Sequence, residues 1–158
     1  MATATFAPDG TDALDERMLL QALTALKKGD FTARLPVEWT GLAGKIAETF
    51  NDVCELNQRM TKELDRVSRV VGKEGKITER ARLGDVSGSW AESVNCVNTL
   101  VSDLVHPTSE MARVIGAVAK GDLSQTMALE LDDRRLEGEF LRTAKIVNRM
   151  VDQLGSFA

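Results

Sequence analysis

The sequence predicts an all-α protein built from tandem helix–connector–helix repeats, and three observations support this prediction. Gly29, Gly75 and Gly121 stand 46 residues apart, and each follows a helical pattern. The letters around them repeat, as in Ala-Leu-Lys-Lys-Gly-Asp-Phe at 25–31 and Val-Ala-Lys-Gly-Asp-Leu at 118–123. Apolar residues between the glycines recur at steps of three and four, the spacing of a coiled coil. Such self-similarity at a fixed period indicates one supersecondary unit used three times.

The composition favours helical bundles and excludes several other classes of protein. The 158-residue chain has no tyrosine and only 4% aromatic residues, so aliphatic side chains must form its core. A net charge of −4 without a cluster of Lys and Arg argues against a nucleic-acid partner. No apolar run approaches the ~20 residues that cross a bilayer, and no secretory leader is visible. We therefore expect a flexible leader at 1–12 and a cytoplasmic location.

The first helix is predicted to end at Gly29, after apolar residues at Leu19, Ala22 and Leu26. Glycine suits this position because it adopts the left-handed turn that closes many helices. A connector should then run from Gly29 to about residue 42. Equivalent connectors are expected from Gly75 to about residue 88 and from Gly121 to about residue 138.

Each connector carries an apolar residue two and six positions after its glycine. These pairs are Phe31 and Leu35, Ile77 and Ala81, and Leu123 and Met127. A connector that climbs beside helices is expected to insert such residues into the apolar seam. Its length of ~13–17 residues suffices to return along a helix, so the two joined helices should be parallel.

The second helix of one repeat is expected to continue into the first helix of the next. No helix breaker lies between Phe50 and Val71, whereas Pro107 predicts a kink or a break in the following helix. The predicted bundle seam consists of Ile46, Phe50, Val53, Asn57, Met60, Leu64, Val67 and Val71; then Val97, Val101, Leu104, Met111 and Val118; and finally Val147, Val151 and Leu154.

Two parallel helices with a climbing connector expose apolar stripes that one chain cannot cover. A symmetric parallel homodimer solves this problem by forming one four-helix coiled-coil bundle per repeat. Stacked bundles of this kind are the predicted architecture.

The repeated motif resembles the HAMP domain of bacterial sensors. The first repeat carries Gly29-Asp30-Phe31 and the landmark Phe50-Asn51, and the third has Pro107 fourteen residues before Gly121. In the third repeat, Glu139 stands nine residues before Asn148, where the family has an acidic residue. The resemblance implies repeats at 13–58, 59–105 and 106–158, of which the second is divergent. The departures are Asp15 in place of the proline, Leu42 in place of the acidic residue and Lys76 in place of the aspartate.

Stretches 66–76, 104–109 and 116–125 are similar to the tandem HAMP arrays of soluble hybrid histidine kinases, the class III osmosensing type. This resemblance implies a signal-relay segment between a sensory domain and a histidine kinase output domain of the same parent chain. It also implies that the connector residues Gly29, Phe31, Leu35, Gly75, Ile77, Ala81, Gly121, Leu123 and Met127, together with Pro107 and Glu139, form the signalling core.

The apolar phase of the second repeat differs from that of the third by one residue. The seam residues nearest to Gly75 stand 4, 8 and 11 positions before it, whereas those of the third repeat stand 3, 7 and 10 before Gly121. One residue rotates a helix face by about 100°. We therefore hypothesise that adjacent repeats prefer opposite rotational states.

No catalytic, cofactor or metal site is expected. The single histidine, His106, lacks the context of a phosphorylated histidine and is interpreted as a helix-junction residue, with pH sensing as an alternative. Cys54 and Cys96 lack metal-ligand spacing and are interpreted as buried or half-buried thiols. The acidic residues Glu130, Asp132 and Asp133 are interpreted as a solvated turn, and Trp39 and Trp90 as anchors of the connectors.

Two other functions remain open at this point. A passive dimerising coiled-coil spacer would need the same helices without any switching. An enzyme or ligand-binding fragment is disfavoured because no convergent set of polar residues is visible.

Overall fold

The computed structural model describes residues 13–157, so the expected leader at 1–12 lies outside the described part. This part is mostly helical, which confirms the all-α prediction apart from one short hairpin. It forms two compact units, one of residues up to Gly75 together with 81–85, the other of 76–80 together with the residues from Val86 onward.

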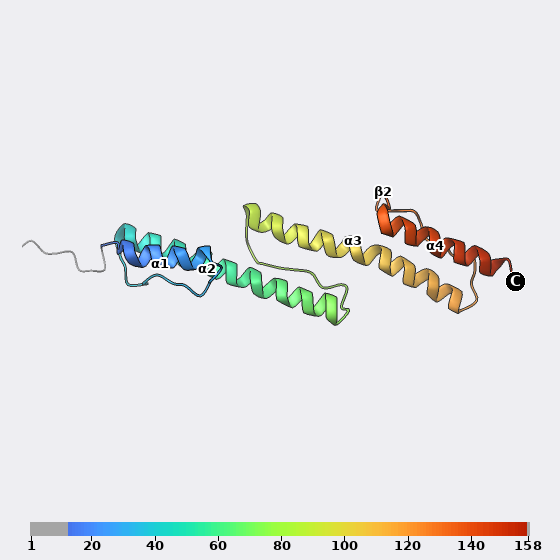
Figure 1. The fold of residues 1–158 in the computed structure, drawn as a ribbon, viewed down its shortest axis with the longest axis horizontal. Coiled ribbons are helices and arrows are strands. Elements are labelled where there is room, and N and C mark those ends of the chain that lie inside the picture. Colours follow the sequence, from blue (N-terminus) through green and yellow to red (C-terminus); the bar gives the residue numbers. More distant parts are fainter. Residues whose placement is uncertain (1–12, 158) are drawn as a thin grey trace, which may run out of the picture. The chain divides into compact units, whose positions relative to one another are not determined.

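In the first unit, helix α1 spans Glu16–Lys27 and helix α2 spans Gly41–Val67 (Figure 1). The Asp15 carboxylate caps α1 by accepting hydrogen bonds from the amides of Arg17 and Met18, at 3.0 and 3.2 Å. Such a cap satisfies amides that have no partner within the helix. The chain then leaves α1 through Gly29, whose φ is +85°.

The connector of the first unit runs antiparallel to α2, which makes α1 and α2 parallel. Arg34 bonds to Gln58, Leu35 bonds to Asn51, and the Trp39 carbonyl lies against Gly44. Figure 1 shows α1 beside the first part of α2. The buried core of this unit consists of Ala22, Leu35, Trp39, Ala43, Ala47, Phe50 and Cys54.

Helix α2 passes directly into a π-helical turn, η1, which spans Ser68–Lys73. In a π-turn a backbone amide bonds to the carbonyl five residues earlier instead of four. Here the amide of Glu74 donates to the carbonyl of Arg69 at 2.9 Å. The apolar spacing of the sequence predicts a helix here but not a π-turn.

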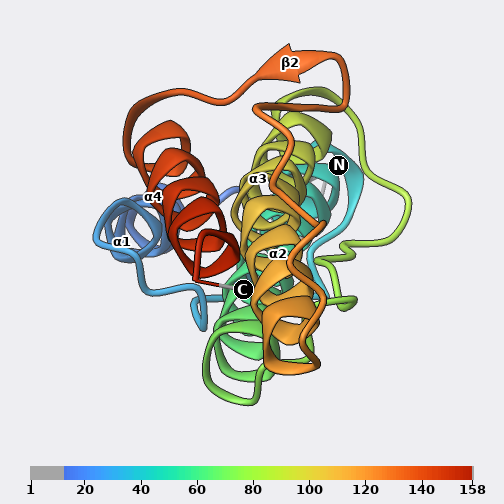
Figure 2. The same ribbon diagram turned by 90° about the vertical axis from the view of Figure 1, so that its right-hand side faces the viewer.

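The second unit contains helix α3, Gly88–Ala119, and helix α4, Gly138–Gly155. Its connector also runs antiparallel to the helix before it, because Gln125 bonds to Arg113 and Arg134 bonds farther back to Asp103. Figures 1 and 2 show α4 beside the second half of α3. The core consists of Val114, Met127, Leu136, Ala144, Val147 and Val151.

Helix α3 continues through Pro107, so of the predicted kink or break the structure excludes the break. Proline removes one backbone donor from the helix, which normally weakens it. Pro107 is nevertheless buried and lies in a cavity wall with Leu136 and Phe140. The burial of Pro107 beside these residues favours the continuous helix, because it adds apolar packing at the point where one backbone hydrogen bond is lost.

A two-stranded antiparallel hairpin in the third connector is the other element that we did not expect. Strand β1, Glu130–Leu131, pairs with strand β2, Arg134–Arg135. Asp132 and Asp133 form the turn with φ values of +51° and +60°. This left-handed pair is the geometry of a two-residue hairpin turn. The acidic turn is exposed, as expected, but it is ordered by strand pairing.

No helix within residues 13–157 is long and apolar enough to span a membrane.

Candidate functional site

All three connectors begin with the same left-handed glycine turn. The φ values of Gly29, Gly75 and Gly121 are +85°, +70° and +84°, as predicted from their place after each helix. Gly29 and Gly121 are each followed by an aspartate whose carboxylate accepts a hydrogen bond from the backbone amide two residues later. A helix end followed by such a turn fixes the direction in which the connector leaves.

The carboxylates of Asp30 and Asp122 make equivalent bonds in the first and third connectors. Asp30 accepts from the amide and hydroxyl of Thr32 at 3.0 and 2.5 Å. Asp122 accepts from the amide and hydroxyl of Ser124 at 2.9 and 2.5 Å. These hydrogen bonds favour the charged form and lower the pKa of both carboxyls below the ordinary value. Lys76 holds this position in the second connector, so the second connector lacks the carboxylate that makes the turn.

An asparagine fixes each of the first and third connectors against its second helix. The side-chain amide of Asn51 accepts from the backbone amide of Leu35 at 2.8 Å and donates to its carbonyl at 3.0 Å. Asn148 binds Met127 in the same way, at 2.7 and 3.0 Å. We call this pair of bonds the asparagine clamp. The clamp gives hydrogen-bond partners to a backbone amide and a carbonyl that no helix or strand satisfies.

The clamped residues are also the buried ones. Leu35 and Met127, six positions after their glycines, are each 3% exposed, and Ala81 in the second connector is 4% exposed. The residues two positions after the glycines are less covered. Phe31 and Leu123 are half-buried, whereas Ile77 is exposed. The connector is therefore fixed chiefly by its second apolar residue.

An arginine folds back over the connector in the first two repeats. Arg34 donates to the carbonyls of Phe31 and Ala33 at 2.6 and 2.7 Å and reaches Gln58 at 2.5 Å. Arg80, 46 residues later, donates to the carbonyls of Ile77 and Glu79 and reaches Ser102 at 3.2 Å. Both guanidinium groups thus join a connector to the helix that follows it.

The third connector is held by an arginine from the preceding helix instead. Arg113 of α3 donates to Gln125 at 2.9 Å and to the carbonyl of Thr126 at 3.3 Å. Its pairing with Glu110, at 2.9 Å, lowers the pKa of the carboxyl and raises that of the guanidinium. The pair is partly exposed, so it contributes little to stability by itself and serves to orient Arg113.

The hairpin adds two further contacts between the third connector and α3. Arg134 pairs with Asp103 at 3.0 Å, and Nδ1 of His106 lies 2.8 Å from a carboxylate oxygen of Asp132. A cavity of about 280 Å³ lies between the hairpin and this part of α3. His106 is half-exposed at a continuous helix, so its expected place at a helix junction is not what the structure shows.

The predicted seam residues divide into buried and uncovered groups. Phe50, Val67, Val147 and Val151 are buried; Ile46, Asn57, Met60, Val71, Val97, Val101, Met111 and Val118 are half-buried; and Val53, Leu64, Leu104 and Leu154 are exposed. Of the two remaining residues of the predicted signalling core, Pro107 is buried, while Glu139 lies exposed in the first turn of α4 and pairs with Arg142 at 3.0 Å.

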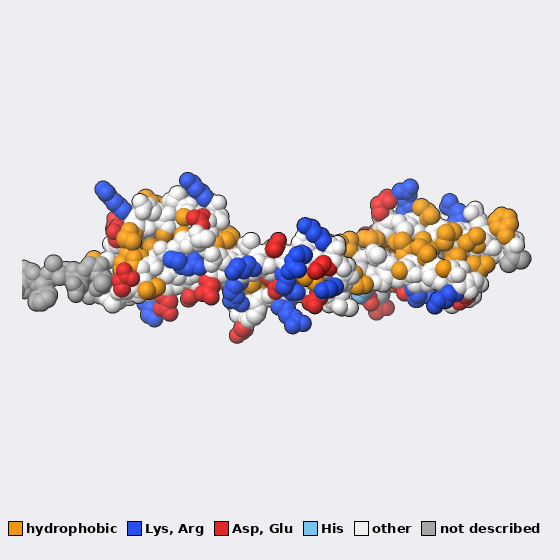
Figure 3. Space-filling model, turned by 90° about the horizontal axis from the view of Figure 1, so that it is seen from below, with side chains coloured by type: hydrophobic (Ala, Val, Ile, Leu, Met, Phe, Trp, Pro, Cys, Tyr) orange, Lys and Arg blue, Asp and Glu red, His pale blue; other side chains and the backbone are white. Residues whose placement is uncertain are grey.

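Each long helix therefore carries one covered and one uncovered apolar line. On α2 the buried line is Ala43, Ala47, Phe50 and Cys54, whereas Val53, three residues from Phe50, is 37% exposed. Further uncovered residues on the helices are Met18, Leu23, Leu64, Leu100, Leu104, Ile115, Ile146, Met150 and Leu154. Figure 3 shows apolar side chains at the surface of both units. Exposed apolar side chains that gather on one surface are typical of interaction sites.

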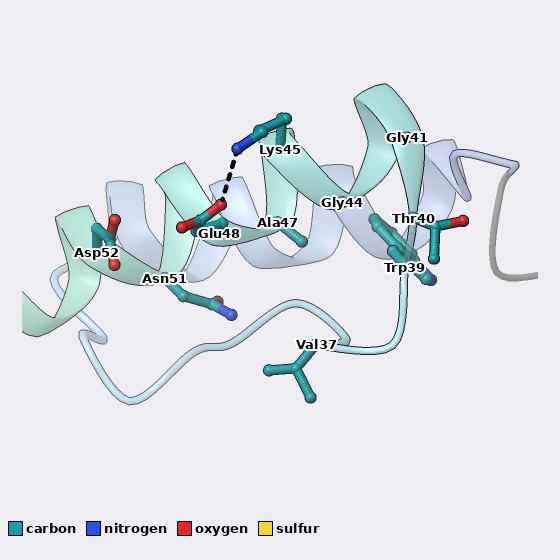
Figure 4. Close-up of a pocket in the computed structure, with 10 residues that line it drawn as sticks. All are labelled: Val37, Trp39, Thr40, Gly41, Gly44, Lys45, Ala47, Glu48, Asn51 and Asp52. Atoms are coloured by element: carbon teal, nitrogen blue, oxygen red, sulfur yellow. Dashed lines mark ion pairs between the residues drawn. The ribbon is translucent and has the colours of Figure 1, made fainter.

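A groove of about 460 Å³ lies between the connector of the first unit and α2 (Figure 4). Trp39 forms its floor near Gly44, which agrees with an anchoring role for this tryptophan. Lys45 pairs with Glu48 at 3.6 Å, and the amide of Asn51 is engaged with Leu35. Three of the polar side chains that line the groove are thus engaged within the chain, and the groove carries no proposal of a ligand site.

Residues 13–157 contain no group of three or more His, Cys, Asp and Glu side chains placed to hold a metal ion. Cys54 is buried, as expected, and burial raises the pKa of its thiol. Cys96 is exposed, which corrects our expectation. It lies between the half-buried residues Val94 and Val97 in the sequence of α3, but at an exposed position of the helix.

Sequence reasoning identified the landmark asparagines but missed their role. Asn51 and Asn148 were predicted only as landmarks of the repeat, with no contacts assigned to their side chains, whereas the structure shows both bonded to the connector backbone. A polar residue repeated at one place in an otherwise apolar pattern was the available signal, because a half-buried amide needs partners.

The fold and the clamped connectors define a class of protein module in which two parallel helices are joined by a connector. The helices of this module carry exposed apolar residues. Residues 85–156 match the family model of the HAMP domain, somewhat less than half of the chain, and this segment is a HAMP domain. No solved structure matches the chain. HAMP domains are non-catalytic modules of sensor and transducer proteins, so the segment belongs to a signal-relay system.

Proposed function

We propose that the chain is a tandem array of three HAMP repeats, at 13–58, 59–105 and 106–158, that relays conformational change. The asparagine clamp carries this proposal. It occurs at Asn51, outside the segment that matches the HAMP model, with the same two bonds as at Asn148 inside that segment. Shared sequence landmarks and shared contacts support a common module.

The proposed working form is a parallel homodimer in which each repeat contributes to a four-helix bundle. The uncovered apolar lines on α1, α2, α3 and α4 supply surface that a second copy would bury. Burial of about 1,200–2,000 Å² in total is usual for a stable pair. Because each chain brings two parallel helices per repeat, a twofold axis along the bundle covers the lines symmetrically.

The proposed partners are a sensory domain before the array and an output domain after it. We propose that the output domain is a histidine kinase and that the array lies in the cytoplasm. Relay requires two packings that differ by a few kcal/mol, so that the input can shift their populations. The imperfect seam supports this requirement, since half-buried Asn57 and small Ala22 and Ala144 interrupt its larger apolar residues.

Disulfide cross-linking tests the parallel dimer. Cys54→Ala and Cys96→Ser first remove the native thiols, and Val53→Cys or Val101→Cys then places one thiol on the proposed seam. Rapid oxidation to a covalent dimer is expected at both sites. Glu48→Cys, at an exposed position beside the groove, is the matched control and should react slowly. Equal rates at all three sites, or a monomer by sedimentation at high concentration, would refute the proposal.

A passive spacer remains the second candidate because α2 and α3 continue without interruption across the expected repeat boundaries. A spacer has one rigid packing, so substitutions that release a connector should leave the output of the parent protein unchanged. A change in output on Asn148→Ala would favour the relay.

A further inference from the structure

The second repeat contains one residue more than its neighbours between its buried helix face and its glycine. In the first and third repeats, the buried residues Ala22 and Val114 each stand seven positions before the glycine. The corresponding buried residue of the second repeat, Val67, stands eight positions before Gly75.

The pattern of burial locates the additional residue. Ala22 is followed three and four positions later by the half-buried pair Ala25 and Leu26, and Val114 is followed in the same way by Ala117 and Val118. Val67 is followed by Val70 and Val71 at the same spacing. Two residues then separate this pair from the glycine in the first and third repeats, whereas Gly72, Lys73 and Glu74 do so in the second.

The π-turn η1 lies where this additional residue must be accommodated. It begins directly after Val67 and ends at Lys73, two residues before Gly75. Because its bonds span five residues instead of four, a π-turn accommodates about one residue more than an α-helical turn does. Here the helical segment that begins with α2 ends in this turn. Beyond the turn, the spacing returns to that of the other repeats, because buried Ala81 again stands six residues after its glycine.

We propose that η1 is a phase compensator, a π-turn that absorbs one residue so that the buried helix face and the connector of the second repeat keep the register of the other repeats. Without it, Gly75 and its connector would be rotated by about 100° around the helix relative to Val67. This proposal is an alternative to the hypothesis that the extra residue sets adjacent repeats in opposite rotational states.

Deletion of Lys73 tests this proposal in the full chain. The amide of Glu74 now bonds to the carbonyl of Arg69 five residues earlier. Removal of one residue between them makes the same bond a regular α-helical one, four residues apart. The matched control is deletion of Lys120, an exposed lysine at the end of α3, where Gly121 and Asp122 already close a regular helix end. Lys73→Ala and Lys120→Ala control for loss of the side chains alone.

Thermal unfolding followed by circular dichroism, at one protein concentration, gives the readout. We expect deletion of Lys73 to leave Tm within about 2 °C of the parent or to raise it, and deletion of Lys120 to lower Tm by more than about 5 °C. Hydrogen exchange should show the Glu74 amide still protected after deletion of Lys73. The proposal is overturned if deletion of Lys73 unfolds the chain or lowers Tm as much as deletion of Lys120, and equally if neither deletion lowers Tm.

Discussion

Asn51 and Asn148 show how one side chain can order a segment that has no regular secondary structure. Each amide group satisfies both the donor and the acceptor of a buried connector residue. The side-chain amide of asparagine offers an acceptor and a donor on one planar group. The connector can thus lie against a helix without a strand to pair with.

Asn148→Ala should lower the free energy of unfolding by about 1–3 kcal/mol, because it leaves the amide and the carbonyl of Met127 without partners. Urea unfolding monitored by circular dichroism measures this loss. Asn148→Asp keeps an acceptor for the amide of Met127 but no donor for its carbonyl, so its stability should fall between those of the parent and the alanine variant. An alanine variant as stable as the parent would show that the clamp contributes nothing.

The Asp30 and Asp122 carboxylates predict a dependence of stability on pH. Hydrogen bonds lower the pKa of both groups in the folded chain, relative to the ordinary value of 3.8. The unfolded chain therefore binds more protons in acid, and the stabilisation present above pH 3.8 is lost as pH falls through the folded pKa values. Urea unfolding between pH 2 and 7 should show the parent more stable than an Asp30→Asn, Asp122→Asn double variant near neutrality, with the difference shrinking in acid. A difference that grows toward acid would contradict this assignment.

At the scale of single elements, the hairpin turn of the third connector is held in a conformation that suits glycine. Asp133 has a φ of +60°, which aspartate tolerates better than most residues but glycine adopts freely. Asp133→Gly should therefore leave stability unchanged or raise it by about 0.5 kcal/mol, whereas Asp133→Val should lower it by about 1–2 kcal/mol. Thermal unfolding of the two variants, compared at equal concentration, provides the measurement.

The regular elements followed from the sequence more directly than the irregular ones. Periodic apolar residues and the glycines at 29, 75 and 121 predicted the helices, their ends and the climbing connectors, because these depend on local spacing. The π-turn follows a spacing difference of one residue that is recognised only when the buried positions of the three repeats are compared. The hairpin and the continuity of α3 at Pro107 involve contacts between the third connector and α3 that spacing along the chain does not reveal. The asparagine clamp lies between these cases, since its residues were noticed but their partners are set by tertiary structure.

Insertions within α2 test whether its helical phase carries information. One alanine inserted after Asn57 rotates everything beyond it by about 100°, whereas seven residues add two nearly complete turns. The single insertion should alter or invert the output of the parent protein, and the seven-residue insertion should be tolerated. Output assays of the two variants in the parent protein give the comparison, and equal effects would argue against rotational relay.

At the scale of the whole molecule, the uncovered apolar lines predict that self-association depends on a few exposed side chains. Leu104 is 48% exposed in the single chain. Leu104→Glu should weaken the dimer at least about tenfold, because an unpaired charge would be buried in an apolar interface. Sedimentation equilibrium measures the dissociation constant. Thr99→Glu, at an exposed polar position on the same helix, is the control and should leave that constant nearly unchanged.

The long helices α2 and α3 also determine how the protein can be divided for experiments. Residues 58 and 105, where the expected repeats meet, lie inside these helices and not in loops. A fragment that begins or ends at either residue would contain an interrupted helix whose terminal backbone amides or carbonyls have no hydrogen-bond partners. Truncations for expression or crystallisation are better placed within the connectors, so that every fragment keeps its helices whole.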